Sequence, residues 1–164
     1  MRAMKQWFAG LAALAASLRL HAQGVNESEV VLGQSAPFSG PAEQLGRDMR
    51  DGALLFFKRL NARGGVHGRQ VSLKSLDDSY EPPRAAANTR QLIEQERVFA
   101  LFGYVGTPTS AAALPIFTQA KVPFFGAFTG AELLRELEEI NKKDPRHNPR
   151  AKTFMDKVKE FFAN

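Results

Sequence analysis

Short apolar runs alternate with longer helical patterns between residues 29 and 134. Four of these runs are rich in β-branched or aromatic residues and are predicted to be strands: 30–34, 69–76, 98–102 and 122–127. Strands that alternate with helices are typical of βαβ units, which build a parallel sheet. The pattern therefore predicts an α/β fold, a flavodoxin-like parallel sheet of about four strands in the order 2-1-3-4 with flanking helices.

The first helix is predicted to begin at Pro41, with Ser39 or Gly40 as its N-cap, and to end at the glycines of 64–65. Its apolar positions recur every three or four residues and define one face: Ala42, Leu45, Met49, Ala53, Phe56 and Leu60. Further helices are predicted over 84–97 and 108–119, and after Gly130 along a stripe of Leu133, Leu134, Leu137 and Ile140. Residues 98–134 contain only two charged side chains, which predicts that they form the centre of the core.

The N-terminal 22 residues have the composition of a secretory signal peptide. Arg2 and Lys5 precede an apolar stretch over 7–18, which is shorter than the roughly 20 residues that span a bilayer. We expect cleavage near Ala22 and a periplasmic location, which agrees with the absence of cysteine. The alternative is a buried or amphipathic N-terminal helix, which the lack of a polar face disfavours.

Charged residues become frequent after Arg135. Residues 141–150 are predicted to be a linker, and the following apolar residues fall on one helical stripe: Phe154, Met155, Val158, Phe161 and Phe162. The chain therefore divides into a signal peptide (1–22), a folded domain (23–140), and a charged linker with an amphipathic helix (141–164). We expect this helical tail to pack on the domain or to mediate self-association.

Charge and residue content exclude several functions. The net charge is +5, but three of the basic residues lie in the first 22 and the others are scattered, so no nucleic-acid-binding surface is expected. Without cysteine, and with three scattered histidines, no catalytic triad or metal site can be assembled. No Gly-rich phosphate motif occurs, so no cofactor is expected. Asp77 and Asp78 are predicted to be a solvated turn pair that caps local backbone groups.

Three loops lie at the predicted carboxyl ends of strands, where open α/β sheets bind their ligands: 35–40, 103–107 and 127–130. Each combines small residues with a hydroxyl and then opens a helix, an arrangement that suits an anion such as a carboxylate. The alternative for Ser39, Thr107 and Thr129 is ordinary helix capping.

The run Asn-Ala-x-Gly-Gly-x-x-Gly at 61–68, with an Asp-Asp pair after the next strand, is distinctive. Together with 33–41, 99–103 and 122–129, it resembles the type 1 periplasmic binding proteins of the leucine/isoleucine/valine-binding kind that serve ABC importers. The resemblance covers 29–135, the first half of an N-terminal lobe.

The resemblance implies a solute site. Thr107 and Thr129 would hold the carboxylate of an amino acid, and the carbonyl of Ala127 would accept from its ammonium. Ser39 and Tyr104, from the same loops, complete the candidate binding residues. The family often has an aromatic side chain at the position of Leu45.

The implied function is that of an exported solute-binding protein, not an enzyme, which captures a branched-chain amino acid or amide for an ABC permease in the inner membrane. Because the resemblance ends within the N-terminal lobe, we expect a truncated protein with impaired binding, whose cleft lacks its second wall. The alternatives are a nonfunctional remnant or a noncatalytic interaction module, and then an enzyme with a doubly wound fold.

Overall fold

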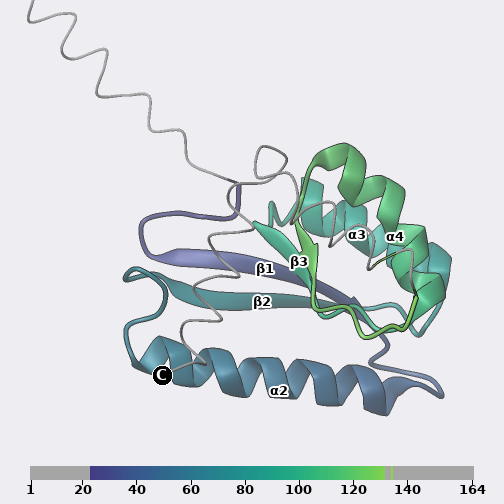
Figure 1. Cartoon of the computed structure of the whole chain (residues 1–164), viewed down its shortest axis with the longest axis horizontal. Helices are drawn as coiled ribbons and strands as arrows, with labels where there is room; N and C mark the ends of the chain where they lie inside the picture. Colours follow the sequence, from purple (N-terminus) through teal and green to yellow (C-terminus); the bar gives the residue numbers. More distant parts are fainter. Residues whose placement is uncertain (1–22, 132–133, 135–164) are drawn as a thin grey trace, which may run out of the picture.

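The computed structural model describes residues 23–131 and 134. Four strands and three helices alternate along the chain (Figure 1). Their bounds are β1 Glu29–Ala36, α2 Glu43–Ala62, β2 Gln70–Asp77, α3 Pro82–Glu94, β3 Ala100–Phe102, α4 Thr107–Ala120 and β4 Phe124–Phe125.

The strands form one sheet in the order β2-β1-β3-β4, and every neighbouring pair is parallel. The pairing of β1 with β2 extends over eight residues, from Glu29 opposite Gln70 to Ala36 opposite Asp77. The pairings of β1 with β3 and of β3 with β4 are shorter. The predicted fold class and strand order are confirmed.

Helices cover both faces of the sheet: α2 lies on one face, and α3 and α4 lie side by side on the other (Figure 1). A hydrophobic cluster lies on each face. The α2 side contains Val30, Leu32, Ala53, Phe57, Leu60, Val71 and Ala100, and the α3/α4 side contains Leu92, Ile93, Val98, Leu101, Tyr104, Ala113 and Phe117. The prediction that residues 98–134 form the centre of the core is confirmed only in part. Strand β3 is central and Val98, Leu101 and Tyr104 are completely buried, but β1 is equally central and β4 is a half-buried edge strand.

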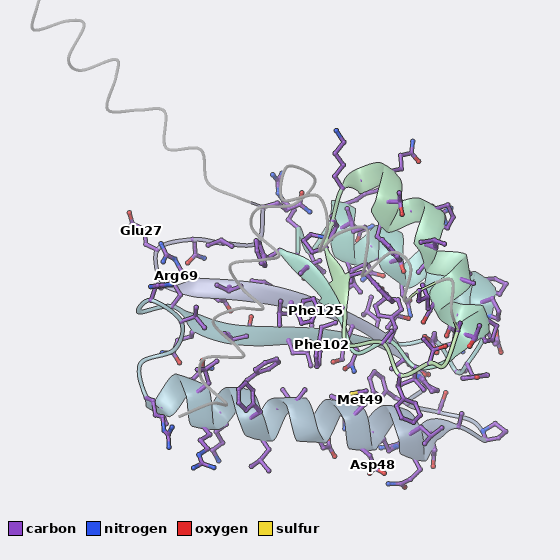
Figure 2. All side chains as sticks on the ribbon, in the orientation of Figure 1. Glu27, Asp48, Met49, Arg69, Phe102 and Phe125 are labelled. Atoms are coloured by element: carbon purple, nitrogen blue, oxygen red, sulfur yellow. The ribbon has the colours of Figure 1, made fainter. Side chains whose placement is uncertain are left out.

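The buried face of helix α2 matches the predicted apolar face at most positions. Ala53 and Leu60 are buried as expected, but Leu45 is exposed and Phe57 is buried in place of the half-buried Phe56. The rings of Phe57 and Phe102 lie edge to face at 5.9 Å between centroids. In Figure 2, Met49 points from the helix toward the sheet, whereas its neighbour Asp48 points away.

The end of α2 follows the prediction, and its beginning does not. Gly64 and Gly65 have φ values of 97° and 70°, and the Gly65 amide donates to the Leu60 carbonyl, which satisfies a terminal carbonyl of the helix. The N-cap is Ala42, with no side-chain cap, instead of Ser39 or Gly40. Ser39 cannot cap the helix because its hydroxyl binds Asp77.

Other boundaries differ by a few residues. Helix α3 begins with two prolines at Pro82 and ends at Glu94, earlier than the predicted 84–97 at both ends. The strands predicted over 98–102 and 122–127 shorten to β3 and β4. Arg97, with φ of 51°, separates the end of α3 from β3.

Three predicted segments lie outside the described residues: the signal peptide over 1–22, most of the helix predicted after Gly130, and the helical tail over 141–164. Within the described part, no helix combines the length and apolar character that crossing a membrane requires.

Candidate functional site

The loops after β1, β3 and β4 lie at the same carboxyl edge of the sheet because their strands are parallel neighbours. The buried amide of Gln34 in β1 donates to the Gly103 carbonyl at 3.0 Å. Beyond β4, the Phe128 amide donates to the Tyr104 carbonyl, and the Gly106 amide donates to the Phe128 carbonyl. These bonds fix the second and third predicted loops relative to each other.

Thr107 and Thr129 come together in this region. Their hydroxyl oxygens lie 2.6 Å apart, so one hydroxyl donates to the other. Thr107 is exposed and is the first residue of α4, whose N-cap is Gly106, so Thr107 does not cap that helix. The half-buried Thr129 accepts a 3.2 Å hydrogen bond from the Ala131 amide, which is compatible with local capping. The two predicted carboxylate ligands are thus adjacent and accessible.

Ala127 and Tyr104 occupy different environments. Ala127 is half-buried beside Phe128. Tyr104 is completely buried, and its ring packs edge to face on Phe124, with centroids 5.1 Å apart. Its hydroxyl lies 2.9 Å from that of Thr89. Burial raises the pKa of Tyr104 further than the Thr89 hydrogen bond lowers it. The side chain of Tyr104 belongs to the core and does not reach the loop surface.

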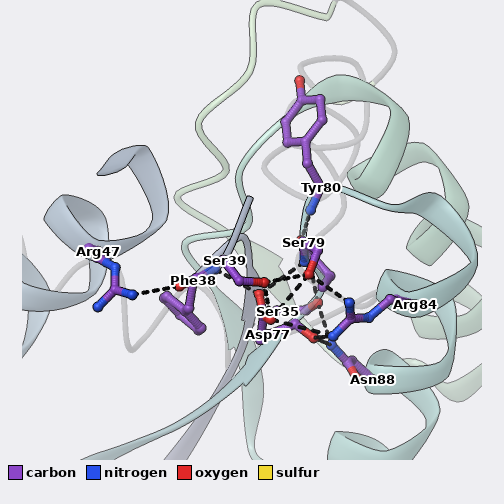
Figure 3. Close-up of polar contacts among 10 residues, drawn as sticks. Ser35, Phe38, Ser39, Arg47, Asp77, Ser79, Tyr80, Arg84 and Asn88 are labelled. Carbon is purple, nitrogen blue, oxygen red and sulfur yellow. Dashed lines mark hydrogen bonds and ion pairs between the residues drawn. The ribbon is translucent and has the colours of Figure 1, made fainter. Parts of the chain in front are cut away.

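Ser39 lies in a polar cluster that joins the loop after β1 to the loop after β2 (Figure 3). Its hydroxyl donates to the Asp77 carboxylate at 2.6 Å and lies 2.6 Å from the Ser79 hydroxyl. The same carboxylate accepts from the backbone amides of Phe38 and Ser79, at 2.7 and 2.9 Å. The hydroxyl of Ser39 therefore fixes loop geometry.

The Asp77–Asp78 pair does cap local backbone groups, but the prediction that both are solvated is wrong. Asp78 is completely buried, accepting from the Ser35 hydroxyl at 2.7 Å and the Tyr80 amide at 2.9 Å. Consecutive strand residues point to opposite faces, so one carboxylate faces the interior and the other faces the loop.

The pKa values of the Asp77 and Asp78 carboxyl groups shift in opposite directions. Burial raises the pKa of Asp78 and outweighs its hydrogen bonds from Ser35 and Tyr80. Burial also opposes ionisation of Asp77, but hydrogen bonds from Ser39, Phe38 and Ser79 outweigh it and lower the pKa of that carboxyl. Arg84 adds an ion pair to Asp77 at 3.4 Å. Asp77 is thus an ionised centre for this cluster.

Two other features bear on possible chemistry. Among the described residues, no group of three or more His, Cys, Asp or Glu side chains could hold a metal ion. A pocket of about 330 Å³ opens between α3 and α4, with Arg90, Glu94 and Gln119 in its lining. These residues lie near the C-terminal ends of both helices, at the opposite end from Thr107, so the pocket is separate from the three loops.

Sequence reasoning missed Tyr80, which is 38% exposed and lies against Gly106. The signal for the loop geometry was present in the Asp-Asp-Ser-Tyr run. Asp77 and Asp78 each accept from the amide two residues ahead, the Asx-turn contact that aspartate favours. The contact between Tyr80 and Gly106 joins two different loops, so no local pattern could indicate it.

Comparison with known proteins agrees with this fold. The family model for periplasmic binding proteins matches residues 29–148, so the match continues past Arg135 and into the segment after 140. The chain belongs to this family.

Individual relatives are similar to this chain over a limited part of their own length. The Leu/Ile/Val-binding protein homolog 7 of Brucella suis is 30% identical over 152 residues, which are 92% of this chain and 37% of the relative. The crystal structure of a possible leucine/isoleucine/valine-binding protein from Rhodopirellula baltica superimposes with a TM-score of 0.66 and 44% identity over 71% of this chain and 32% of its own.

A branched-chain amino acid transporter substrate-binding protein from Streptococcus pneumoniae, solved in complex with isoleucine, superimposes with a TM-score of 0.59. It is 29% identical over 63% of this chain and 30% of its own. The chain thus spans about a third of the length of the relatives that it matches. The family consists of substrate-binding proteins and implies a periplasmic location.

Proposed function

We propose that this chain binds the carboxylate of a small solute, such as a branched-chain amino acid or amide, at Thr107 and Thr129. The observation that carries this proposal is the 2.6 Å approach of the two hydroxyls at the first turn of α4. Each threonine comes from a loop that follows a different strand, and ligands of open α/β sheets bind at such a strand edge.

The chemistry of the pair suits a carboxylate. Without a ligand, one threonine hydroxyl serves as acceptor for the other. With a carboxylate bound, both can donate, one to each oxygen. In the first turn of α4, Pro108 has no N–H, but the Thr107 and Thr109 amides have no acceptor within the helix, and the helix dipole places partial positive charge at this end. The carbonyl of Ala127 would accept from the ammonium of an amino acid. The isoleucine complex of the streptococcal relative supports this class of solute.

The Asp77 cluster positions a neighbouring loop. Asp77 holds the Phe38 amide and the Ser39 hydroxyl, which anchors residues 37–40 beside the carboxyl ends of β1 and β2. In this proposal, Ser39 contributes by fixing that loop. The side chain of Tyr104 is left out of the proposed site because it is completely buried.

The proposal extends to transport, in which the chain is exported by its N-terminal segment and delivers the solute to an ABC permease in the inner membrane. The family and the amino acid-binding relatives support this role. Because the threonine pair lies at an exposed edge, where water competes for its hydrogen bonds, the described residues are expected to bind a carboxylate weakly, with a Kd of about 1 mM.

Ligand-observed NMR with leucine, valine and simple amides tests the proposal. Wild-type protein is compared with Thr129→Ala and with Thr118→Ala, which removes an exposed hydroxyl at the other end of α4. We expect weak binding that Thr129→Ala weakens about fivefold and that Thr118→Ala leaves unchanged. Equal binding by all three proteins would return Thr129 to a capping role. Absence of binding by the wild type would favour a noncatalytic interaction module.

A further inference from the structure

Tyr80 is an aromatic side chain held at the loop edge of the sheet. It is 38% exposed and has φ of 66°, directly after Ser79 with φ of 50°. Residues other than glycine seldom adopt this left-handed conformation, and here the Asp78 carboxylate accepts the Tyr80 amide at 2.9 Å. Figure 3 shows the ring projecting away from the polar cluster around Asp77. The buried carboxylate therefore holds the backbone from which the ring projects.

The ring of Tyr80 lies against Gly106, the residue before Thr107. A Cβ atom added at Gly106 would lie 2.4 Å from Cε2 of Tyr80 and 2.8 Å from its hydroxyl oxygen. Glycine at this position therefore leaves the space that the ring occupies. The Tyr80 ring, which comes from the loop after β2, thus lies beside the residue that directly precedes Thr107.

The exposed surface of the Tyr80 ring is apolar apart from its hydroxyl. In the described part of the chain, the Tyr80 hydroxyl makes no hydrogen bond. The side chain of Leu45 is 48% exposed and is also close to the start of a helix at this edge. Aromatic rings recognise other rings by offset or edge-to-face contact, a preference beyond the burial of apolar area.

We infer that Tyr80 determines the specificity of this site and selects small carboxylates that carry an aromatic ring. This inference rests on the proposed carboxylate site at Thr107 and Thr129. The carboxylate binds the two hydroxyls, and the ring of the solute packs against the ring of Tyr80. An aliphatic carboxylate of the same size still binds the two threonine hydroxyls but cannot make the ring-to-ring contact with Tyr80.

Benzoate and cyclohexanecarboxylate test this inference, since they share the carboxylate and nearly the same size. Affinities are measured by ligand-observed NMR for wild type, Tyr80→Phe, Tyr80→Leu and the remote control Leu55→Ala, at an exposed position of α2. Wild type should prefer benzoate by about two- to tenfold. Tyr80→Phe and Leu55→Ala should keep this preference, and Tyr80→Leu should lose it while still binding cyclohexanecarboxylate. Phe and Leu carry the same backbone strain as Tyr80, so these variants differ only in the side chain.

A direct measurement on the wild type does not depend on the folding of any variant. The chain has two tyrosines, and Tyr104 is completely buried, so tyrosine-selective labelling gives one exposed ring signal. That signal should shift when benzoate is added. Equal affinity for the two carboxylates, or binding without a shift of the Tyr80 signal, would overturn the role of Tyr80 and leave the threonine site standing. Failure of both carboxylates and of the amino acids to bind would overturn the inference together with the proposed function.

Discussion

The hydroxyl oxygens of Thr107 and Thr129 lie 2.6 Å apart, although the two residues are 22 positions apart in the chain. The bridge between Val105 and Phe128 brings the two loops together just before these threonines. A pair of hydroxyls at a helix N-terminus can present two donors to one anion. Their arrangement makes the proposed site testable by mutation of either residue.

Thr107→Val and Thr129→Val should weaken the binding of a carboxylate in a non-additive way. Each hydrogen bond at this exposed edge contributes about 1 kcal/mol, so each single variant should lose about fivefold in affinity. Because both hydroxyls serve the same carboxylate, the double variant should lose less than the sum of the single free-energy changes. Titration by NMR measures the four affinities. Strict additivity would mean that the two threonines act on separate groups.

Asp77→Asn should lower the free energy of unfolding by about 1–3 kcal/mol at pH 7, because the ionised carboxylate accepts several hydrogen bonds. The folded state lowers the pKa of Asp77, so its stabilisation is fully present above the ordinary aspartate pKa of about 3.9. It is lost as the pH falls below that value. Urea unfolding from pH 7 to pH 3 should show the difference between wild type and variant shrinking. A difference that stays constant with pH would contradict this account.

Asp78 should produce the opposite pH dependence. Burial raises its pKa in the folded state, so its contribution to stability is fully present below the ordinary aspartate pKa of about 3.9 and is lost as the pH rises through the raised value. Relative to Asp78→Asn, the wild type should therefore be most stable below pH 4 and should lose part of this advantage toward neutral pH. The same urea series measures both profiles. Parallel profiles for the Asp77 and Asp78 variants would refute the assignment of one buried and one loop-facing carboxylate.

Gly106→Ala and Gly52→Ala should change stability in opposite directions. Gly106 has φ of 99°, and a Cβ atom there would collide with the ring of Tyr80, so alanine should cost about 1–3 kcal/mol. Gly52 lies inside α2 with open space around its α-carbon, so alanine should stabilise the protein by up to about 1 kcal/mol. Thermal unfolding measures both. A neutral Gly106→Ala would show that Tyr80 moves aside without cost.

Export should remove the first 22 residues. The basic start and short apolar stretch predict cleavage between Ala22 and Gln23 when the full chain is produced in a Gram-negative host. N-terminal sequencing of periplasmic protein identifies the new terminus. Replacing Leu11 and Leu14 by arginine should interrupt the apolar stretch and keep the chain in the cytoplasm. Retention of Met1 by the unaltered chain would contradict the prediction.

The sequence by itself determined the order and type of the elements, because apolar periodicity and turn residues are local signals. The parallel sheet, the glycine-terminated α2 and the placement of Thr107 and Thr129 after neighbouring strands all followed from such patterns. The threonines were found because parallel strands end at the same edge, so connectivity alone brings their loops together.

Tertiary structure decided what each side chain in those loops contacts. Ser39 binds Asp77 instead of capping α2, Asp78 is buried, and Tyr104 faces Thr89 in the core. Each outcome depends on a partner from another strand or helix. The contact of Tyr80 with Gly106 is of the same kind, because the space beside a glycine is filled only when a second loop reaches it. Such contacts depend on packing between distant segments, which local sequence patterns do not specify.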